Sequence, residues 1–397
     1  MKQVEWKERK TSLGNAIIIG AVMALVGGVV GANWNTIFGG FAPYLGFSNK
    51  SSNIDWSPLN EVYNTLVSSY NGEIDKNAII EGAKKGLVAS LGDVYTVYMD
   101  AETASDFYDD LHGNVGAGIG VEMGMRDGYV RVLRTLPDNP ARRAGVLAGD
   151  IIYKVDGEEV WSLDSEAISK KVRGEAGTEV TVTMVRDGKE IDYKMTRETI
   201  NNVSAYVEYD GHTAIVTVTR FDNDTGTKVQ QIANEFSGKG INKVILDLRG
   251  NGGGYVSAAQ DLLSLWIDGE KVLEQKSLHY GNTVTKALSG KAILKDMKTI
   301  VLVNGSTASA SEIVAGALQD YGKATILGEK TYGKGVVQNL FDNLSGGSLL
   351  KVTTAEWYTP NDRSINKEGI TPDVEVERSY EDINAMRDPQ MDKAKAL

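Results

Sequence analysis

The feature that most constrains the fold is the alternation of strand-like and helix-like segments between residues 201 and 378. Short apolar runs such as "KVILDL" and "TIVLV" are typical of buried strands, while "TKVQQIANEF" and "SAAQDLLSLWI" have helical periodicity. Strands separated by helices predict βαβ units and a largely parallel sheet. Sites in such sheets form where the strands end at their carboxyl side. Two loops, "DLRGNGGG" and "VLVNGSTAS", occupy that location.

Two other regions of the chain have different patterns. Residues 56–113 place apolar residues at three- and four-residue intervals, which predicts helices. Residues 114–200 contain short, alternating, turn-bounded segments such as "EVTVTMVRDG", which predict a small β-rich module. Two short helices fit inside that module, one opened by Pro140 and one closed by Gly174. The chain of 397 residues is too long for one ordinary core, so several domains are expected.

Composition excludes several function classes. The formal net charge of −11 argues against nucleic acid or an anionic membrane surface as the main partner. The absence of cysteine removes disulfides, thiolate metal sites and cysteine nucleophiles. His112, His212 and His279 are scattered and lack the spacing of metal ligands. We therefore expect neither a metal nor a cofactor.

The N-terminus has the layout of a targeting segment. Four basic residues within the first ten precede the uncharged apolar run Ala16–Ala32. This asymmetry predicts an N-terminus inside the cell and the bulk of the protein outside. Val30 and Ala32 could mark a signal-peptidase site, but the run is longer than an ordinary cleaved signal, which favours a retained anchor. The expected location is a bacterial cytoplasmic membrane, crossed once, or the exterior if cleavage occurs.

The stretch "NGSTASASEIVAG" permits two interpretations. Ser309 and Glu312 have the spacing of a capping box, which would satisfy free N–H groups at a helix start. A serine at that position can also be a nucleophile, because the helix N-terminus stabilises an oxyanion. Capping serines are far commoner, so this stretch alone favours the cap.

The segment "GEKTYGKGVVQNL" supplies a candidate base. Lys334 lies between two glycines, and Gln338 follows four residues later. If the segment is extended, Lys334, Val336 and Gln338 share one face. A lysine can act as the base for a serine only when its amine is neutral, which burial among apolar groups favours and an adjacent carboxylate opposes. A Ser-Lys dyad fits these residue types, although a glycine-flanked lysine is usually a turn residue in water.

The β-rich module opens with "VGAGIGVEM", whose glycines allow a backbone nest. Such a nest can hold a carboxylate while the following strand pairs with an incoming peptide. A plain strand entry with turn glycines is the alternative. Arg173, at the end of the second short helix, suits a peptide carboxylate or a contact with the catalytic core, or is an ordinary surface arginine.

Several separate motifs in the right order resemble the carboxyl-terminal processing proteases, also called tail-specific proteases. They are "GAGIGV", "VRGEAGTEV", "VILDLRGNGGG", "VNGSTASASEIVAGALQDY", "GEKTYGKGVVQ" and "EGITPDVEV". The resemblance implies a serine endopeptidase whose crotonase-like α/β core carries an inserted PDZ domain. Here Gly252 and Tyr255 replace the proline and leucine that often follow the family's D-L-R-x, which puts the choice of oxyanion glycine in doubt.

The resemblance also implies roles for individual residues. The family nucleophile is the first serine of its S-A-S-E string, Ser309, and the family lysine and glutamine fall on Lys334 and Gln338. The family's oxyanion donors are backbone N–H groups, expected here from Ala310 and Gly253. The peptide-binding residues of the PDZ domain are expected to be Gly118, Ile119, Gly120 and Val121. Expected partners are proteins or peptides with free C-termini, the membrane, and a second copy through terminal helices.

The predicted fold class is thus α/β, with a crotonase-like core, an inserted β-rich PDZ domain, a helical N-terminal region and one membrane segment. The predicted parts are a cytoplasmic basic N-terminus (1–14), an anchor or signal segment (15–38), a linker (39–54), a helical region (55–112), the PDZ domain (113–200), the protease core (201–380) and a C-terminal tail helix (381–397).

Two other functions are open to such a chain. It could be a membrane-tethered PDZ adaptor without catalysis, although the presence of Ser309, Lys334 and Gln338 speaks against that. It could also be a Ser-His protease, which would require one of the three histidines to be essential.

Overall fold

The computed structural model describes residues 54–126, 128–385 and 387–397. The predicted anchor or signal segment, 15–38, lies outside these residues. No helix in the described ranges is long and apolar enough to cross a membrane. The chain divides into two compact units, at Lys76. The described part of the first unit contains helix α3 (Ser57–Ser69), in which Leu59 and Val62 are more than half exposed.

The second unit is built around a six-stranded sheet in the order β10-β11-β12-β15-β16-β19. Strand β10 pairs antiparallel with β11, and all later neighbours are parallel, as the alternation of strands and helices predicts. The bounds are β10 (Ala205–Asp210), β11 (Thr213–Val218), β12 (Lys243–Asp247), β15 (Lys298–Val303), β16 (Thr325–Gly328) and β19 (Val374–Glu375).

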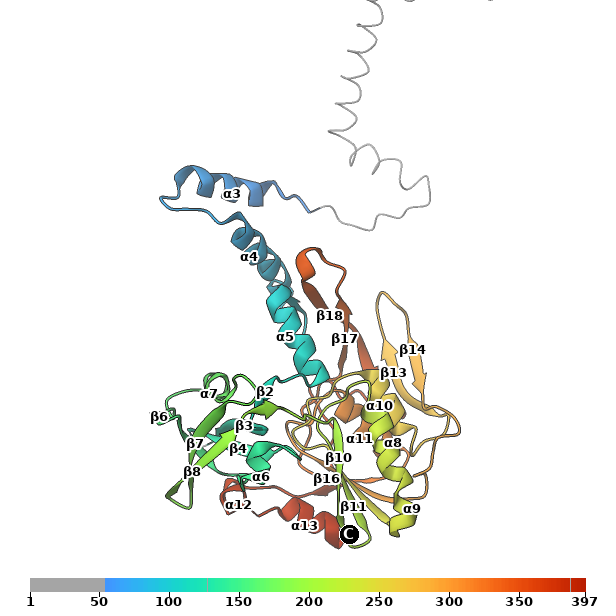
Figure 1. Cartoon of the computed structure of the whole chain (residues 1–397). Helices are drawn as coiled ribbons and strands as arrows, with labels where there is room; N and C mark the ends of the chain where they lie inside the picture. The colour runs from blue at the N-terminus through green and yellow to red at the C-terminus, as the bar shows by residue number, and fades with distance from the viewer. Residues whose placement is uncertain (1–53, 127, 386) are drawn as a thin grey trace, which may run out of the picture. The chain divides into compact units, whose positions relative to one another are not determined.

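Both faces of this sheet are covered, because successive strand residues point to opposite sides. Val244 and Leu246 belong to the main apolar core, which they share with α8 (Thr225–Asn234), α10 (Val256–Leu263) and α11 (Ala310–Asp320). Ile245 belongs to a smaller cluster with Ala394 of α13 (Pro389–Ala396). Helices α8 and α10 lie side by side (Figure 1). Short helices α9 (Phe236–Lys239) and α12 (Tyr380–Asn384) complete this part.

A second sheet is antiparallel and joins distant parts of the chain. Its order is β1-β18-β13-β14, and β17 also pairs with β18. The bounds are β1 (Val97–Met99), β13 (Lys271–Lys276), β14 (Thr283–Lys286), β17 (Val336–Phe341) and β18 (Leu349–Tyr358), with a 3-10 turn η2 (Ser345–Gly347) before β18.

Strand β1 corrects the expectation of a purely helical pattern across residues 56–113. It lies between α4 (Lys76–Ala89) and α5 (Ala101–His112), and its partner β18 is some 250 positions away. Met99 packs with Ala104 and Leu349 in a separate small core. Long-range pairing, and not local pattern, makes these three residues a strand.

The β-rich module forms its own core within the second unit. Strands β3-β4-β5-β7-β8 make one sheet and β2-β9 a short second one. Ile152 and Ile168 are fully buried in its centre. The bounds are β2 (Ala117–Gly118), β3 (Val121–Arg126), β4 (Tyr129–Thr135), α6 (Pro140–Arg143), β5 (Ile151–Val155), β6 (Glu158–Glu159), α7 (Ser165–Val172), β7 (Glu179–Arg186), β8 (Lys189–Thr196) and β9 (Glu198–Thr199).

Candidate active site

Ser309 lies at the carboxyl end of the main sheet, between β15 and the start of α11. Its backbone has φ 57° and ψ −118°, a conformation with positive φ that is uncommon outside glycine. Such strain persists only where the surrounding structure imposes it, and it is frequent at functional sites. The side chain is partly exposed, while the helix behind it is buried from Ala310 to Leu318. The partly exposed serine is therefore held at the start of a buried helix.

The glycine loop lies directly against the serine. Gly253 has φ 105°, and a Cβ atom placed on it would lie 2.8 Å from the Ser309 Cβ and 2.9 Å from the Ala310 nitrogen. Only glycine permits this approach. As the first residue of α11, Ala310 has an N–H group without an acceptor inside the helix. The two residues predicted to hold an oxyanion are thus neighbours in space.

Asn251 organises this loop and was not identified from the sequence. Its buried side chain accepts the Gly253 N–H at 2.9 Å and donates to the Val218 carbonyl at 2.8 Å. Its carbonyl accepts the Ala308 N–H and the Ser311 hydroxyl, both at 3.0 Å. Because the Gly253 N–H is already engaged, it can bind an oxyanion only by giving up the bond to Asn251.

Glu312 joins the serine to the lysine through their backbones. Its carboxylate is fully buried, and Oε2 accepts the N–H groups of Ser309 and Lys334, each at 2.9 Å. Oε1 accepts the Thr331 hydroxyl at 2.6 Å and the Gly333 N–H at 2.7 Å. The capping interaction predicted for this residue is therefore one of four bonds. Its larger consequence is a fixed spacing between residues 309 and 334.

Lys334 lies in the loop just before β17 and is partly buried. Burial lowers the pKa of its amine, and the positive charge of Lys351 lowers it further. The carboxylates of Glu312 and Asp93 oppose this, but the net direction is downward. The Nζ atom lies 5.2 Å from the centroid of the Tyr95 ring. Burial and the charge of Lys351 thus both favour the neutral form of this amine.

Gln338 makes fewer polar contacts than Glu312 does. It lies on β17, and its amide donates to the Thr353 hydroxyl at 3.4 Å. Val336 and Gln338 lie two residues apart on β17, and the register shift opposite them comes from an extra residue on β18. Both therefore lie on one face of the strand. Because Lys334 precedes the strand, its place on that face stays a prediction. In the described part of the chain, the Lys334 amine makes no hydrogen bond to Ser309 or Gln338. Catalytic hydrogen bonds often tighten only once substrate is bound.

The histidines lie elsewhere. His212 precedes β11 and contacts the Gly240 carbonyl at 2.9 Å, at the end of the sheet opposite Ser309. His112 lies 3.3 Å from the Tyr255 hydroxyl, and His279 is exposed after β13. Within the described ranges, no cluster of three His, Cys, Asp or Glu side chains could hold a metal ion.

The predicted peptide-binding residues line a cavity of about 620 Å³. Gly118, Ile119, Gly120 and Val121 all line it, together with Arg173 from the end of α7. Gly120 has φ 76°, and a Cβ there would meet the Asn139 side chain at 2.2 Å. The cavity also reaches Arg220 and Gly250 of the α/β core. A groove beside the start of β3 suits an added peptide strand.

Comparison with known proteins matches three parts of the chain to family models. Residues 212–376 match peptidase family S41, 117–196 match the PDZ domain, and 46–103 match the N-terminal domain of the activating protease CtpB. These matches cover the regions in which the sequence predicts a core, a PDZ domain and a helical segment.

Longer relatives extend the likeness over nearly the whole chain. "Probable CtpA-like serine protease" of Staphylococcus saprophyticus is 32% identical over 387 residues, covering 97% of this chain and 77% of the relative. The protein of that name from Staphylococcus aureus is 34% identical over 340 residues, covering 85% and 68%. The solved structure of the photosystem II D1 C-terminal processing protease has a TM-score of 0.55 and 29% identity, covering 84% of this chain and 90% of that one. The chain therefore belongs to the C-terminal processing proteases of peptidase family S41, which are serine peptidases.

Proposed function

We propose that this protein is an envelope endopeptidase that captures free protein C-termini in its PDZ domain and cleaves with a Ser309–Lys334 dyad. The observation that carries the proposal is the arrangement around Glu312. One buried carboxylate holds the backbone of a strained serine and that of a lysine whose pKa is lowered by burial.

The chemistry follows from these positions. The neutral Lys334 amine takes the proton from the Ser309 hydroxyl as Oγ attacks the peptide carbonyl. The carbonyl oxygen becomes an oxyanion, held by the Ala310 N–H and by an N–H of the 252–254 glycine run. Collapse of this intermediate breaks the C–N bond, and the Lys334 ammonium protonates the departing amine. Water, deprotonated by the same amine, then hydrolyses the acyl-enzyme and regenerates the serine.

The glutamine has an orienting role in this proposal. Gln338 is neutral, so it can direct the Lys334 amine without holding it protonated. In the unbound arrangement its amide faces Thr353. Substrate binding must then bring the side chains of Lys334, Gln338 and Ser309 within hydrogen-bonding distance of one another.

Substitution of the nucleophile tests the proposal. Ser309→Ala should abolish cleavage of unfolded protein substrates that the parent chain cuts, while peptide binding is retained. A PDZ adaptor without catalysis would show no cleavage in the parent either. A chain in which all three histidines are replaced should retain proteolysis, which would exclude a Ser-His mechanism. Turnover by Ser309→Ala at the parental rate would refute the dyad.

Recognition of a free C-terminus has its own test. The full-length Ser309→Ala chain should bind a peptide with an apolar terminal residue more tightly as the free acid than as the amide. The reason is that amidation removes the charge that the N–H groups around Gly118 and Gly120 would hold. Equal affinity for the two forms would contradict carboxylate capture.

The envelope location rests on the N-terminal sequence. Basic residues before the apolar run Ala16–Ala32 favour a single-pass anchor with the catalytic part outside the cytoplasm. In bacterial cells whose outer layers are opened and whose cytoplasmic membrane is intact, an added protease should digest the catalytic part. After cell lysis, the protein should sediment with the membranes. Recovery of the full-length chain in the cytosolic fraction would contradict this location.

A further inference from the structure

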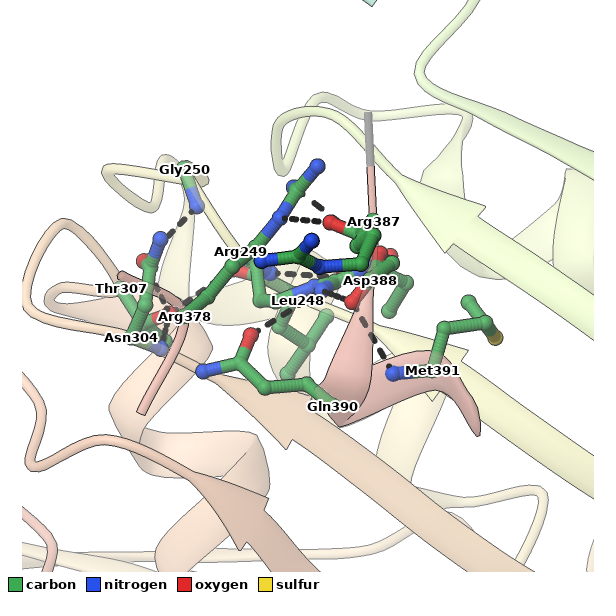
Figure 2. Close-up of polar contacts among 11 residues, drawn as sticks. Leu248, Arg249, Gly250, Asn304, Thr307, Arg378, Arg387, Asp388, Gln390 and Met391 are labelled. Carbon is green, nitrogen blue, oxygen red and sulfur yellow. Dashed lines mark hydrogen bonds and ion pairs between the residues drawn. The ribbon is translucent and has the colours of Figure 1, made fainter. Parts of the chain in front are cut away.

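The first turn of the C-terminal helix touches the glycine loop of the active site (Figure 2). Asp388 caps α13 by accepting the Met391 N–H at 3.0 Å. The same carboxylate accepts Nη1 of Arg249 at 2.9 Å, and the Gln390 amide oxygen accepts Nη1 at 3.0 Å. Asp388 and Gln390 are called the C-terminal clasp below. None of the site residues predicted from the sequence lies in this helix.

Arg249 is built into the glycine loop. Its other nitrogens pair with Asp247 at the end of β12, at 2.9 and 2.7 Å, and only 13% of its side chain is exposed. The residues on either side bond to the serine loop: the Leu248 carbonyl accepts the Thr307 hydroxyl at 2.9 Å, and the Gly250 N–H donates to Asn304 at 3.0 Å. A shift of Arg249 would therefore disturb the contacts that place the glycine run beside Ser309.

Gln390 also reaches the lysine loop. Its side chain is buried, and its amide nitrogen donates to Glu329 at 3.1 Å and to the Val376 carbonyl at 2.8 Å. Glu329 begins the loop that leads to Lys334 and bonds through its N–H to the Val303 carbonyl at 3.1 Å. One amide group thus joins the glycine loop, through its oxygen, to the lysine loop, through its nitrogen.

We propose that the C-terminal clasp positions the glycine loop and the lysine loop relative to each other, so that the seating of α13 sets the turnover number. Asp388 and Gln390 are positioning residues: they act through Arg249 and Glu329 and do not touch substrate. The proposal rests on the proposed function, because it assigns these two loops to the oxyanion and the base. Small misplacements of catalytic groups by distant changes are known to cost large factors in rate.

Three variants test the contacts of Gln390 and Asp388 separately. Gln390→Met keeps the length of the side chain and removes its polar contacts to both loops. Asp388→Asn removes the charge toward Arg249 but keeps an oxygen that caps the helix. Asp388→Glu keeps the charge and serves as the conservative rescue. Asp392→Asn is the matched control, because Asp392 lies in the same helical turn and is exposed.

The experiment measures kcat and KM on one peptide, well below the unfolding midpoint of each variant. We expect kcat to fall about tenfold in Gln390→Met, which loses hydrogen bonds to two charged groups, Arg249 and Glu329. It should fall about threefold in Asp388→Asn, which loses only the charge paired with Arg249. KM should stay parental, because the variants leave the residues of the PDZ domain that line the peptide groove, Gly118 to Val121, unchanged. Asp388→Glu should recover most of the loss, and Asp392→Asn should match the parent.

Two results would overturn the proposal. One is a parental kcat in both Gln390→Met and Asp388→Asn. The other is a lower unfolding midpoint with no change of kcat at temperatures where the variants are folded, which would make the contact merely stabilising. If Gln390→Met fails to fold, Asp388→Asn decides alone. Failure of the proposed function is distinguishable, since Ser309→Ala would then retain turnover whatever the clasp variants do.

Discussion

The two halves of the candidate site differ in how firmly they are built. The serine half is held by buried polar groups: Asn251 and Glu312 both bond to the loops around Ser309. In the lysine half, Glu312 fixes the backbone of Lys334, but the amine lies against the Tyr95 ring, without a hydrogen bond to Ser309. The proposed nucleophile is therefore held in place before substrate binds, whereas the proposed base has still to be aligned with it.

This difference separates two kinds of contribution to rate. Rigid donors and a rigid nucleophile stabilise charge without reorganisation during the reaction. A base that is aligned only with substrate makes cleavage conditional on correct binding, as in induced fit. Changes in the serine half should then affect stability and turnover together. Changes in the lysine half should affect turnover and its pH dependence alone.

The largest effect should come from the base itself. Lys334→Arg keeps the charge but removes the ability to deprotonate, so kcat/KM should fall by about 10²–10⁴-fold. In the parent, kcat/KM should rise with pH through the lowered pKa of Lys334 and then level off, because only the neutral amine accepts the proton. The measurement is kcat/KM against pH on one peptide. Near-parental turnover by the arginine variant across that range would show that Lys334 is not the base.

Among changes in the serine half, Glu312→Gln should lower the stability of the fold most. The carboxylate accepts four hydrogen bonds, and an amide group cannot accept them all, so buried N–H groups are left without partners. The free energy of unfolding should fall by about 2–4 kcal/mol. The pH midpoint of kcat/KM should move downward, because the charge that raises the pKa of Lys334 is gone.

Denaturant unfolding and the pH profile of Glu312→Gln are both needed. An upward movement of the midpoint would mean that Glu312 does not act on the lysine charge. Unchanged stability would mean that the serine half is held by other contacts than those of this carboxylate.

Much of this arrangement could be predicted from the sequence. The alternation of strands and helices indicated a parallel sheet, and the family resemblance placed Ser309, Lys334 and Gln338 by motif and spacing. Local pattern could not show which side chains hold the loops together. Asn251 was not singled out by any sequence pattern, and Glu312 had only the spacing of a capping box with Ser309. Both act through partners far along the chain, such as Val218 and Lys334.

The antiparallel sheet shows the same limit. Strand β1 has only three residues, and its strand character comes from pairing with β18. The register shift opposite Gln338 likewise arises on β18, which has one extra residue between the partners of Val337 and Gln338. The alternation within β17 does not predict a bulge in the strand with which it pairs.

Two substitutions of Gln338 test whether its side chain orients the Lys334 amine. Gln338→Ala removes the orienting group and leaves the base, so kcat should fall about tenfold, less than in Lys334→Arg. Gln338→Glu adds a carboxylate that favours the protonated amine, so the pH midpoint should move upward. Both are measured as kcat/KM against pH, with thermal unfolding as the check on folding. A loss in Gln338→Ala as large as that in Lys334→Arg would mean that the two side chains act as one unit.

Lys351 should affect the midpoint more than the maximal rate. It lies half-buried on β18, with Nζ 5.2 Å from the Phe107 ring centroid, and its charge lowers the pKa of Lys334. Lys351→Gln removes that charge, so the pKa of Lys334 rises and the midpoint moves upward, opposite to Glu312→Gln. At high pH, where Lys334 is neutral in both proteins, kcat/KM of Lys351→Gln should be within about threefold of the parental value. Lys286→Gln, on the exposed strand β14 of the same sheet, is the control. An unmoved midpoint in Lys351→Gln would contradict the electrostatic coupling.

The smallest effect should come from Arg173, which belongs to neither half of the site. Its exposed side chain lines the peptide cavity at the end of α7, where a guanidinium can pair with a peptide carboxylate. Exposed charge pairs contribute little, so Arg173→Ala should raise KM by about two- to fivefold and leave kcat unchanged. Against the amidated peptide, parent and variant should have the same KM, because no carboxylate is present. A fall in kcat with unchanged KM would instead make Arg173 a contact that transmits binding to the core. No change in either constant would leave it an ordinary surface arginine.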